Sequence, residues 1–476
     1  MAKIFIEEST LSAIGDSIRA KTGKTDMISP LKMPTEIASI QAGGSSAPVS
    51  ANAVTFYDYD GMIVASYTLE EAQALTSLPD APTYDGLTFQ GWNWSLENVN
   101  TLIQSMNIGA MYITDDGKTR LHIYIADKAR STVPLYISQT VANGITIDWG
   151  DGSATETLAG TGNVNTSHVY GVAGDFTISL TVADGCTLGF GHNSNGYCVM
   201  GITGTNGKVY CNMLQNVEIG SGVTSIGSSA FQYCYSLSSI TIPDGVTSIG
   251  NSAFSNCSSL SSITIPNGVT SIGSNAFASC YSLSSITIPD GVTSIGNSAF
   301  SDCSSLSSIT TPNGVTSIGN YAFSNCSSLS SITIPDGVTS IGNSAFSNCS
   351  SLSSITIPNG VTSIGSNAFA SCSSLSSITI PNGVTSIGSS VFSSCYSLSS
   401  ITIPNGVTSI GSNAFSNCYG VAEYHLKPTT PPTLSSTNAF KNIPSDCIIY
   451  VPKGCLETYQ NATNWTTYAS HIQEEP

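Results

Sequence analysis

Nine cysteines that recur every 23 residues are the most regular residues in the chain that could do chemistry. They are Cys234, Cys257, Cys280, Cys303, Cys326, Cys349, Cys372, Cys395 and Cys418. Coils stacked about 4.8 Å apart would bring such residues within the Cα range of a disulfide, so distance alone leaves disulfides and free thiols open. Their odd number, and a fixed place three residues after a phenylalanine, favour a column of buried free thiols that pack as small hydrophobic groups.

The other residues with catalytic or metal-binding potential form no recognisable site. Cys186, Cys198 and Cys211 have no clustered histidine partner, so we assign no zinc site. Asp151 lies between two glycines, which is typical of a turn residue rather than a metal ligand or a catalyst. A polysaccharide-cleaving enzyme needs two carboxylates in different environments, whereas the acids of the repeats lie mostly in turns. We therefore expect no enzyme activity, no metal and no cofactor.

The nine thiols belong to a 23-residue repeat that fills residues 212–418. Pro243 ends the short strand of one copy, because proline has no N–H to donate to a ladder. A fixed period of this length predicts a solenoid in which each unit buries its apolar face only against its neighbours. The inward positions of the copy that begins at Ser236 are Leu237, Ile240, Ile242, Val246, Ile249, Ala253, Phe254 and Cys257.

This pattern closely resembles the BspA-type leucine-rich repeats of bacterial adhesins and of some parasite surface proteins. The resemblance implies a leucine-rich-repeat solenoid, but it does not specify a ligand, because the family is defined by its core. One copy carries Thr311 in a column that is otherwise isoleucine. If that side chain is buried and its hydroxyl is unpaired, we expect a local loss of about 1–3 kcal/mol.

The outward residues of the repeat strand define a candidate binding face. Ser239 and Thr241 point away from the apolar positions, and each repeat restates them, which predicts a Ser/Thr ladder about 40 Å long. A tyrosine intermittently follows the repeat cysteine and can stack on a sugar ring. The candidate ligand-binding residues are Ser239, Thr241, Ser262, Thr264, Ser285, Thr287, Ser331, Thr333, Tyr235, Tyr281 and Tyr396.

Residues 1–43 predict a short helical attachment module, and residues 44–49 have the composition of a flexible linker. Thr10 can cap a helix whose apolar residues share one face. The segment 11–23, followed by residues 28–40, resembles the head of tail-associated proteins in phages and prophages of Gram-positive bacteria. This resemblance implies a module that attaches the chain to a virion.

A small β-rich unit is predicted over residues 50–108. Its strands flank an Asp60-Gly61 turn. Residues 78–92 resemble the signature of the β-grasp repeats found in bacterial surface proteins, and such units usually act as spacers.

Residues 109–187 predict an all-β sandwich with Trp149 in its core. The segments 148–153, 168–170 and 174–182 resemble the polycystic-kidney-disease (PKD) domain. Residues 188–211 would then lead into the solenoid.

Residues 419–476 break the repeat period and are predicted to cap the solenoid, whose open end would otherwise expose a sheet edge. Residues 447–452 predict a last strand, and residues 456–472 predict a helix whose aromatic side chains pack in the cap. The ending also resembles the terminal cap of BspA-type proteins.

Charge and length exclude several classes of protein. The 476 residues are too many for one core, and the net charge is −17. Residues 212–418 contain five acids and neither Lys nor Arg, so we expect no nucleic-acid partner and no anionic membrane surface. The first residues lack the apolar stretch of a secretory signal, and no run is long enough to insert into a membrane. We therefore expect assembly in a bacterial cytoplasm.

Together these patterns predict a multidomain, mainly β protein: a leucine-rich-repeat solenoid of nine repeats with a C-terminal cap, preceded by a PKD-like β-sandwich, a β-grasp-like unit and a short helical module. The preferred function is host recognition by a phage or prophage tail-associated protein located in the virion tail. Residues 1–43 would contact other tail proteins, and the solenoid would bind a host-surface glycan or protein. The alternatives are a bacterial or parasite cell-surface adhesin and, third, a polysaccharide-degrading tailspike enzyme. The sequence leaves open whether the chain forms a homo-oligomer.

Overall fold

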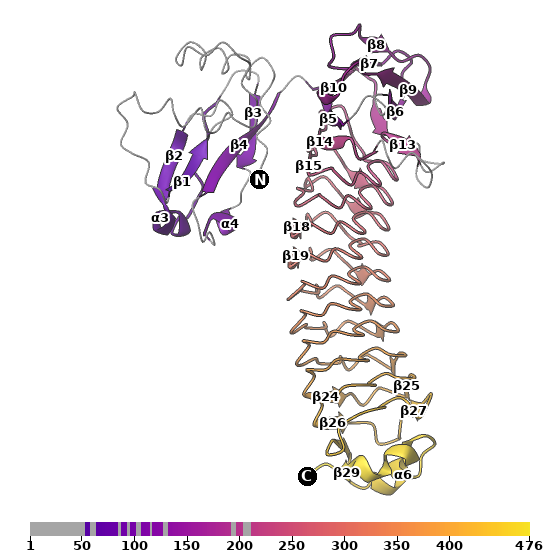
Figure 1. Cartoon of the computed structure of the whole chain (residues 1–476). Coiled ribbons are helices and arrows are strands. Elements are labelled where there is room, and N and C mark those ends of the chain that lie inside the picture. The colour runs from indigo at the N-terminus through magenta and orange to yellow at the C-terminus, as the bar shows by residue number, and fades with distance from the viewer. Residues whose placement is uncertain are drawn as a thin grey trace. The chain divides into compact units, whose positions relative to one another are not determined.

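A computed structural model describes residues 53–57, 63–83, 87–92, 96–100, 106–114, 117–126, 132–191, 197–202 and 211–476. The chain divides into two compact units, Met1–Asp116 and Gly117–Pro476, whose elements are labelled in Figure 1. The helical module and the linker predicted over residues 1–49 lie outside the described residues.

The first unit contains a four-stranded sheet in the order β2-β1-β4-β3, in which β1 and β4 run parallel. Its core contains Val54, Phe56 and Trp92, and the Trp92 Nε1–H donates to the Pro79 carbonyl at 2.8 Å. The described elements are β1 (Ala53–Tyr57), β2 (Ile63–Thr68), α3 (Leu69–Gln73), β3 (Leu87–Trp92), α4 (Leu96–Asn100) and β4 (Met106–Thr114). Because β4 pairs with β1 and β3, residues 109–114 belong with this unit. The β-grasp resemblance stays a prediction.

The second unit begins with two sheets that share one core, in agreement with the predicted all-β sandwich. One sheet has the order β15-β14-β5-β10-β7-β8 and the other has the order β11-β6-β9. Apolar side chains of both sheets fill the core, together with Trp149, which is 2% exposed. The strands are β5 (Thr119–Ile125), β6 (Thr132–Gln139), β7 (Ile145–Asp148), β8 (Glu156–Thr157), β9 (Gly162–Val169), β10 (Gly174–Val182) and β11 (Leu188–Phe190), followed by the pair β12 (Tyr197–Cys198) and β13 (Gly201–Ile202). The assignment to the PKD family stays a prediction.

The sandwich continues directly into the solenoid. Strand β14 (Leu214–Glu218) pairs antiparallel with β5 on one side and parallel with β15 (Ser239–Thr241) on the other. The Phe190 ring lies 5.1 Å from the Phe231 ring of the first coil, between centroids. The Val199 amide donates to the Ala230 carbonyl at 2.7 Å. The sandwich is therefore the N-terminal cap of the solenoid as well as the unit that precedes it.

Each coil of the solenoid has three sides, which we name by the residues of the copy that begins at Ser236. The strand side (residues 238–242) forms regular strands at β15, β18 (Ser285–Thr287), β19 (Ser308–Thr310) and β24 (Ser400–Ile403). The second side (residues 246–250) forms two-residue strands that pair in parallel between coils. They are β16 (Ser248–Ile249), β17 (Ser271–Ile272), β20 (Ser317–Ile318), β21 (Ser340–Ile341), β22 (Ser363–Ile364), β23 (Ser386–Ile387) and β25 (Ser409–Ile410).

The third side (residues 251–257), which we call the turn side, has a different hydrogen-bond pattern. The Phe254 amide donates to the Ala276 carbonyl of the following coil at 2.8 Å, and the Ser252 and Asn256 amides donate in the same direction. Ser252 and Asn256 have positive φ angles of 55° and 64°, a conformation that short polar side chains tolerate best. The Ser and Asn side chains at these positions therefore favour the backbone conformation that the turn side requires.

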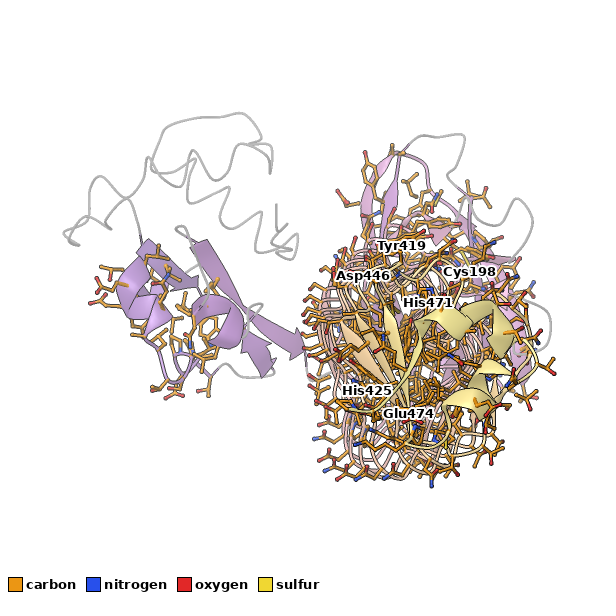
Figure 2. The ribbon with its side chains drawn as sticks, turned by 90° about the horizontal axis from the view of Figure 1, so that it is seen from below. Cys198, Tyr419, His425, Asp446, His471 and Glu474 are labelled. Atoms are coloured by element: carbon orange, nitrogen blue, oxygen red, sulfur yellow. A yellow bond between two sulfur atoms is a disulfide. The ribbon has the colours of Figure 1, made fainter. Side chains whose placement is uncertain are left out.

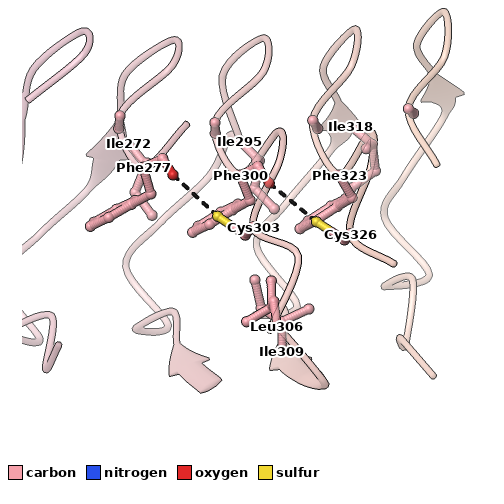
Figure 3. Packing of buried hydrophobic residues seen from close by; sticks show 14 of the residues in the cluster. Ile272, Phe277, Ile295, Phe300, Cys303, Leu306, Ile309, Ile318, Phe323 and Cys326 are labelled. Atoms are coloured by element: carbon pink, nitrogen blue, oxygen red, sulfur yellow. Dashed lines mark hydrogen bonds between the residues drawn. The ribbon is translucent and has the colours of Figure 1, made fainter. Parts of the chain in front are cut away.

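A column of phenylalanine rings and a column of thiols run side by side through the core (Figure 3). The Phe277, Phe300 and Phe323 rings are stacked with centroids 5.4 and 5.6 Å apart. The Cys303 thiol donates to the Phe277 carbonyl at 3.1 Å, and Cys326 repeats this contact one coil later. All nine repeat cysteines are buried and free. The predicted column of free thiols is therefore confirmed, and its sulfurs also act as hydrogen-bond donors.

We expect the repeat thiols to be unreactive toward a thiol reagent in the native protein. They are buried, and burial raises the pKa of Cys280 and Cys372 to about 12, so almost no thiolate exists at neutral pH. A titration with Ellman's reagent should detect only the partly exposed Cys455 in the folded chain and all 12 free thiols after unfolding. Rapid modification of several thiols in the folded chain would contradict this packing.

Sequence spacing did not indicate the disulfide that joins Cys198 to Cys211. The bond links β12 to the residue that precedes β14 by three positions. It therefore lies at the junction between the sandwich and the first coil.

Thr311 is buried in the isoleucine column, with 7% of its surface exposed. Its hydroxyl is paired, however, and donates to the Thr333 carbonyl of the next coil. The condition for a loss of about 1–3 kcal/mol is therefore not met, and the cost of this threonine is smaller.

We expect Thr311→Ile to raise the free energy of unfolding by about 1 kcal/mol, because the added buried hydrocarbon outweighs one hydrogen bond. Chemical denaturation measures this change. Thr311→Val is the matched control, since it removes the hydroxyl without adding the full isoleucine side chain. Equal or lower stability of Thr311→Ile would contradict the expectation.

The C-terminal residues continue the solenoid before they close it, whereas the sequence predicted that the period ends. Strands β24, β26, β28 and β29 form one parallel sheet. The predicted last strand is β28, but β29 follows it. The predicted helix over residues 456–472 is wrong, because Asn464 adopts a left-handed conformation with φ of 64° and divides the segment. The elements are β26 (Glu423–Leu426), β27 (Thr433–Leu434), β28 (Ile448–Val451), α6 (Leu456–Gln460), the 3-10 helix η3 (Trp465–His471) and β29 (Ile472–Glu474).

Aromatic side chains of the cap cover the last coil, as predicted. Tyr459 and Trp465 are fully buried, and Trp465 lies 5.5 Å from the Phe440 ring that ends the phenylalanine column. The Tyr468 hydroxyl accepts the Phe440 amide at 3.1 Å. The Phe440 amide belongs to the turn side and has no following coil to accept it, so the Tyr468 hydroxyl takes the place of the missing carbonyl.

Candidate functional site

The structure places the predicted Ser/Thr ladder on the strand side of the solenoid. Ser239 is exposed, but its hydroxyl donates to Asn216 Oδ1 at 2.7 Å, and Thr241 is half-buried beside the sandwich sheet. The other predicted ladder residues are all exposed: Ser262, Thr264, Ser285, Thr287, Ser331 and Thr333. The ladder brings them together in two columns, with Ser285 beside Ser308 and Thr287 beside Thr310 in the parallel register of β18 and β19.

The hydroxyls of the ladder differ from other hydroxyls of the repeat. In a neighbouring column, Ser307 Oγ donates to the Ser284 carbonyl at 3.2 Å, and Ser330 repeats this contact. On the second side, Thr270 Oγ1 donates to the Thr247 carbonyl at 3.5 Å. Those hydroxyls hold adjacent coils together. By contrast, over the described coils from residue 262 to residue 402 the ladder hydroxyls make no hydrogen bond within the chain, so they can donate to and accept from a ligand.

The predicted tyrosines form a third column at one edge of the ladder. Tyr235 is half-buried, whereas Tyr281 and Tyr396 are 48% and 49% exposed. Tyr419, at the same repeat position, is 57% exposed. Its ring lies 5.7 Å from that of Tyr396 at an interplanar angle of 9°. The sequence shows this position, but it does not show that the two rings stack.

Ionisable groups flank the uncharged ladder at its N-terminal end. Thr241 pairs with Glu218, and Glu218 pairs with Arg120 on β5. His122 Nε2 lies 3.3 Å from Glu218 Oε1, and the Arg120 guanidinium lies 3.9 Å from the same carboxylate. These charges come from the sandwich, so the ladder is continuous with the outer face of the sandwich sheet.

A second ionisable cluster ends the ladder at its C-terminal side. Glu423 and His425 take the places of the ladder Ser and Thr beside Ser400 and Thr402. His425 Nε2 lies 3.2 Å from Glu423 and Nδ1 lies 3.1 Å from Glu475. Hydrogen bonds from Lys427 and then His425 lower the pKa of Glu475. The cluster is internally paired.

No metal centre is evident in the part of the chain that the structure describes: no three His, Cys, Asp or Glu side chains are placed to hold an ion. Within the same residues, no helix has the length and apolar character needed to cross a membrane.

Asp151 is a turn residue, as predicted, and it also pairs with His168. Its Oδ1 accepts the Ser153 amide at 3.0 Å, and its Oδ2 lies 2.7 Å from His168 Nε2. The His168 ring stacks on Trp149. The pair therefore fixes the turn against the sandwich core.

We expect this turn to stabilise the second unit at neutral pH and to lose that effect in acid. Hydrogen bonds from Ser153 and then His168 lower the pKa of Asp151 from 3.8 to about 2. A lowered pKa means that the stabilisation is complete above about pH 4 and is lost as pH falls through about 2. Melting curves should show a smaller acid-induced decrease for Asp151→Asn than for the unaltered chain. Parallel curves would contradict this expectation.

The coil geometry defines a leucine-rich-repeat solenoid, and a comparison with protein families agrees. The family described as "BspA type Leucine rich repeat region" matches residues 209–307 and 293–422 in six copies. This match supports the predicted class for the repeat region. The family match does not extend to the β-grasp-like and PKD-like segments or to residues 1–43.

Solved structures with sequence similarity are also bacterial leucine-rich-repeat proteins. One from Bacteroides ovatus is 28% identical over 56% of this chain and 85% of its own, with a TM-score of 0.31. A leucine-rich cell surface protein of Faecalibacterium prausnitzii is 29% identical over 55% and 84%, with a TM-score of 0.32. The pneumococcal vaccine antigen PcpA is 20% identical over 55% and 66%, with a TM-score of 0.35. A search of curated proteins gives no match.

Proposed function

We propose that the protein is a surface-recognition protein of the adhesin type, which binds a cell-surface glycan or protein through the Ser/Thr ladder. The observation that carries this proposal is the unpaired state of the exposed ladder hydroxyls between residues 262 and 402, in a repeat whose other hydroxyl columns bond between coils. The family match to BspA-type repeats supports a role at a surface. The proposal involves no catalytic step and no cofactor.

This function is compatible with two locations of the chain, a phage tail and a cell surface. The resemblance of residues 1–43 to tail-associated proteins favours a phage or prophage tail, in which that segment contacts other virion proteins. In the alternative, the chain is an adhesin on a bacterial or parasite cell surface, in keeping with the BspA-type match. Electron microscopy with an antibody against the solenoid distinguishes them, because it labels either virion tails or intact cells.

The binding proposal is tested by blocking the ladder without altering the core. Thr287→Arg with Thr310→Arg places two long charged side chains on adjacent exposed ladder positions. The matched control is Thr293→Arg with Thr316→Arg, on the exposed second side of the same coils. We expect at least tenfold weaker binding of labelled full-length protein to target cells for the ladder variant, and no change for the control. Equal binding by both variants would remove the ladder as the binding face.

A further inference from the structure

The tyrosines of the tyrosine column are not required to build the solenoid. The column position directly follows the repeat cysteine, and several coils carry serine there. Where serine is present, its hydroxyl can bond to the previous coil: Ser350 Oγ donates to the Ser327 carbonyl at 3.3 Å, and Ser373 Oγ donates to the Ser350 carbonyl at 3.2 Å. A tyrosine at this position lacks this contact, and about half of its surface is exposed to solvent.

Two of these tyrosines lie next to each other. Tyr396 and Tyr419 lie on consecutive coils as nearly parallel rings, 49% and 57% exposed. The Tyr419 hydroxyl donates to Asn417 Oδ1 at 3.2 Å, and Asn442 Nδ2 donates to the same oxygen at 2.8 Å. Asn417 thus links the Tyr419 hydroxyl to the following coil. The two stacked rings, each about half exposed, form an aromatic pair at the surface, which we call the platform.

Hydrogen-bonding residues recur at a fixed spacing after each tyrosine of the platform. Ser400 of the ladder follows Tyr396 by four residues, and Glu423 occupies the same place after Tyr419. Asp446 lies on the next coil and is exposed. In the view from the C-terminal end, Tyr419 and Asp446 lie on one side of the molecule, away from His425 and Glu474 (Figure 2). An exposed carboxylate, that of Asp446, therefore lies on the side of the molecule that carries Tyr419, and the Ser400 hydroxyl follows Tyr396 in the sequence.

We infer that the Tyr396–Tyr419 pair is a stacking subsite for the pyranose rings of a neutral, linear polysaccharide that lies along the Ser/Thr ladder. This inference rests on the proposed surface-recognition function and names its ligand class. Aromatic faces attract the C–H faces of sugar rings, while hydroxyl and carboxylate groups bond to sugar hydroxyls. Equivalent phenylalanine rings of adjacent coils lie 5.3–5.7 Å apart, between centroids, a spacing similar to that of successive sugars in an extended chain. Successive sugars would then meet equivalent hydroxyls on successive coils.

A glycan fits this surface better than a protein does. Protein interfaces have an apolar centre enriched in aromatic residues, Met and Arg. Here the ladder beside the platform consists of small hydroxyl residues, and residues 212–418 contain no Lys or Arg. The absence of positive charge in this segment also disfavours acidic polysaccharides.

The test uses the full chain and two matched variants. Tyr396→Ser with Tyr419→Ser introduces the serine that other coils already carry in this column, so folding is preserved. Tyr321→Ser is the control, because Tyr321 is 50% exposed in another column that also contains serine. Calorimetry measures binding to cellohexaose, chitohexaose and an α-1,6-mannohexaose. A parallel assay measures binding to intact target cells, before and after treatment with protease or with periodate.

We expect the unaltered chain and the control to bind at least one hexasaccharide, and the double variant to bind it at least tenfold more weakly. Cell binding should be sensitive to periodate and insensitive to protease. If the unaltered chain binds cells but the double variant binds equally well, the stacking subsite is overturned and the proposed function stands. Protease-sensitive, periodate-resistant binding would overturn the glycan class. If the unaltered chain binds neither glycans nor cells, both proposals fall.

Discussion

A chain that begins at residue 212, and therefore consists of the solenoid and its C-terminal cap, should fail to give a soluble monomer. Removal of the sandwich uncovers the Phe231 ring and the apolar face of β14, and it leaves the Ala230 carbonyl without the Val199 amide. Several buried apolar side chains would each lose about 1–2 kcal/mol, on the order of 5 kcal/mol in total. The bared edge of β14 would also pair with other chains.

The matched control is a chain that begins at Gly117, the start of the second unit. We expect it to be a monomer with the thermal midpoint that this unit has in the full chain. Size-exclusion chromatography and differential scanning calorimetry make the comparison. A soluble, monomeric chain from residue 212 with an unchanged midpoint would show that the sandwich is a spacer only. Binding experiments on the solenoid should therefore include the sandwich.

Phe323→Ala should lower the free energy of unfolding by about 3–5 kcal/mol, the cost of a large cavity in a core that cannot collapse. The Phe323 ring is fully buried between the rings of Phe300 and Phe346, at 5.6 and 5.4 Å. Each coil contacts only its neighbours, so a weak coil in the middle uncouples the two halves. We expect two transitions in chemical denaturation.

Tyr321→Ser on the same coil is the control, because it removes an exposed ring and should change stability by less than about 0.5 kcal/mol. A single transition for Phe323→Ala, with a midpoint close to that of the control, would contradict the nearest-neighbour account. It would mean that stability is shared over many coils.

The apolar columns of the repeat were predictable because they depend on a local pattern. Leu237, Val246, Phe254 and Cys257 are fully buried, as their period indicates. The exposed ladder was predictable for the same reason, since alternate residues of a strand face opposite ways. Its ability to bind a ligand stays a prediction.

Features that join distant segments could not be read from the sequence. The pairing of β14 with β5 links residues about 95 positions apart, and neither strand carries a signal that names its partner. The Cys198–Cys211 disulfide depends on the same junction. In the cap, the break at Asn464 depends on a single left-handed residue, which an apolar period does not show.

Backbone hydrogen bonds between coils run in opposite directions on different sides of the solenoid. On the turn side the Phe254 and Asn256 amides donate toward the C-terminal end, whereas the Thr270, Gly273 and Ser282 amides donate toward the N-terminal end. The peptide dipoles therefore largely cancel, as in most sheets and unlike in an α-helix. The number of repeats can consequently change by duplication without building up an electric dipole along the solenoid.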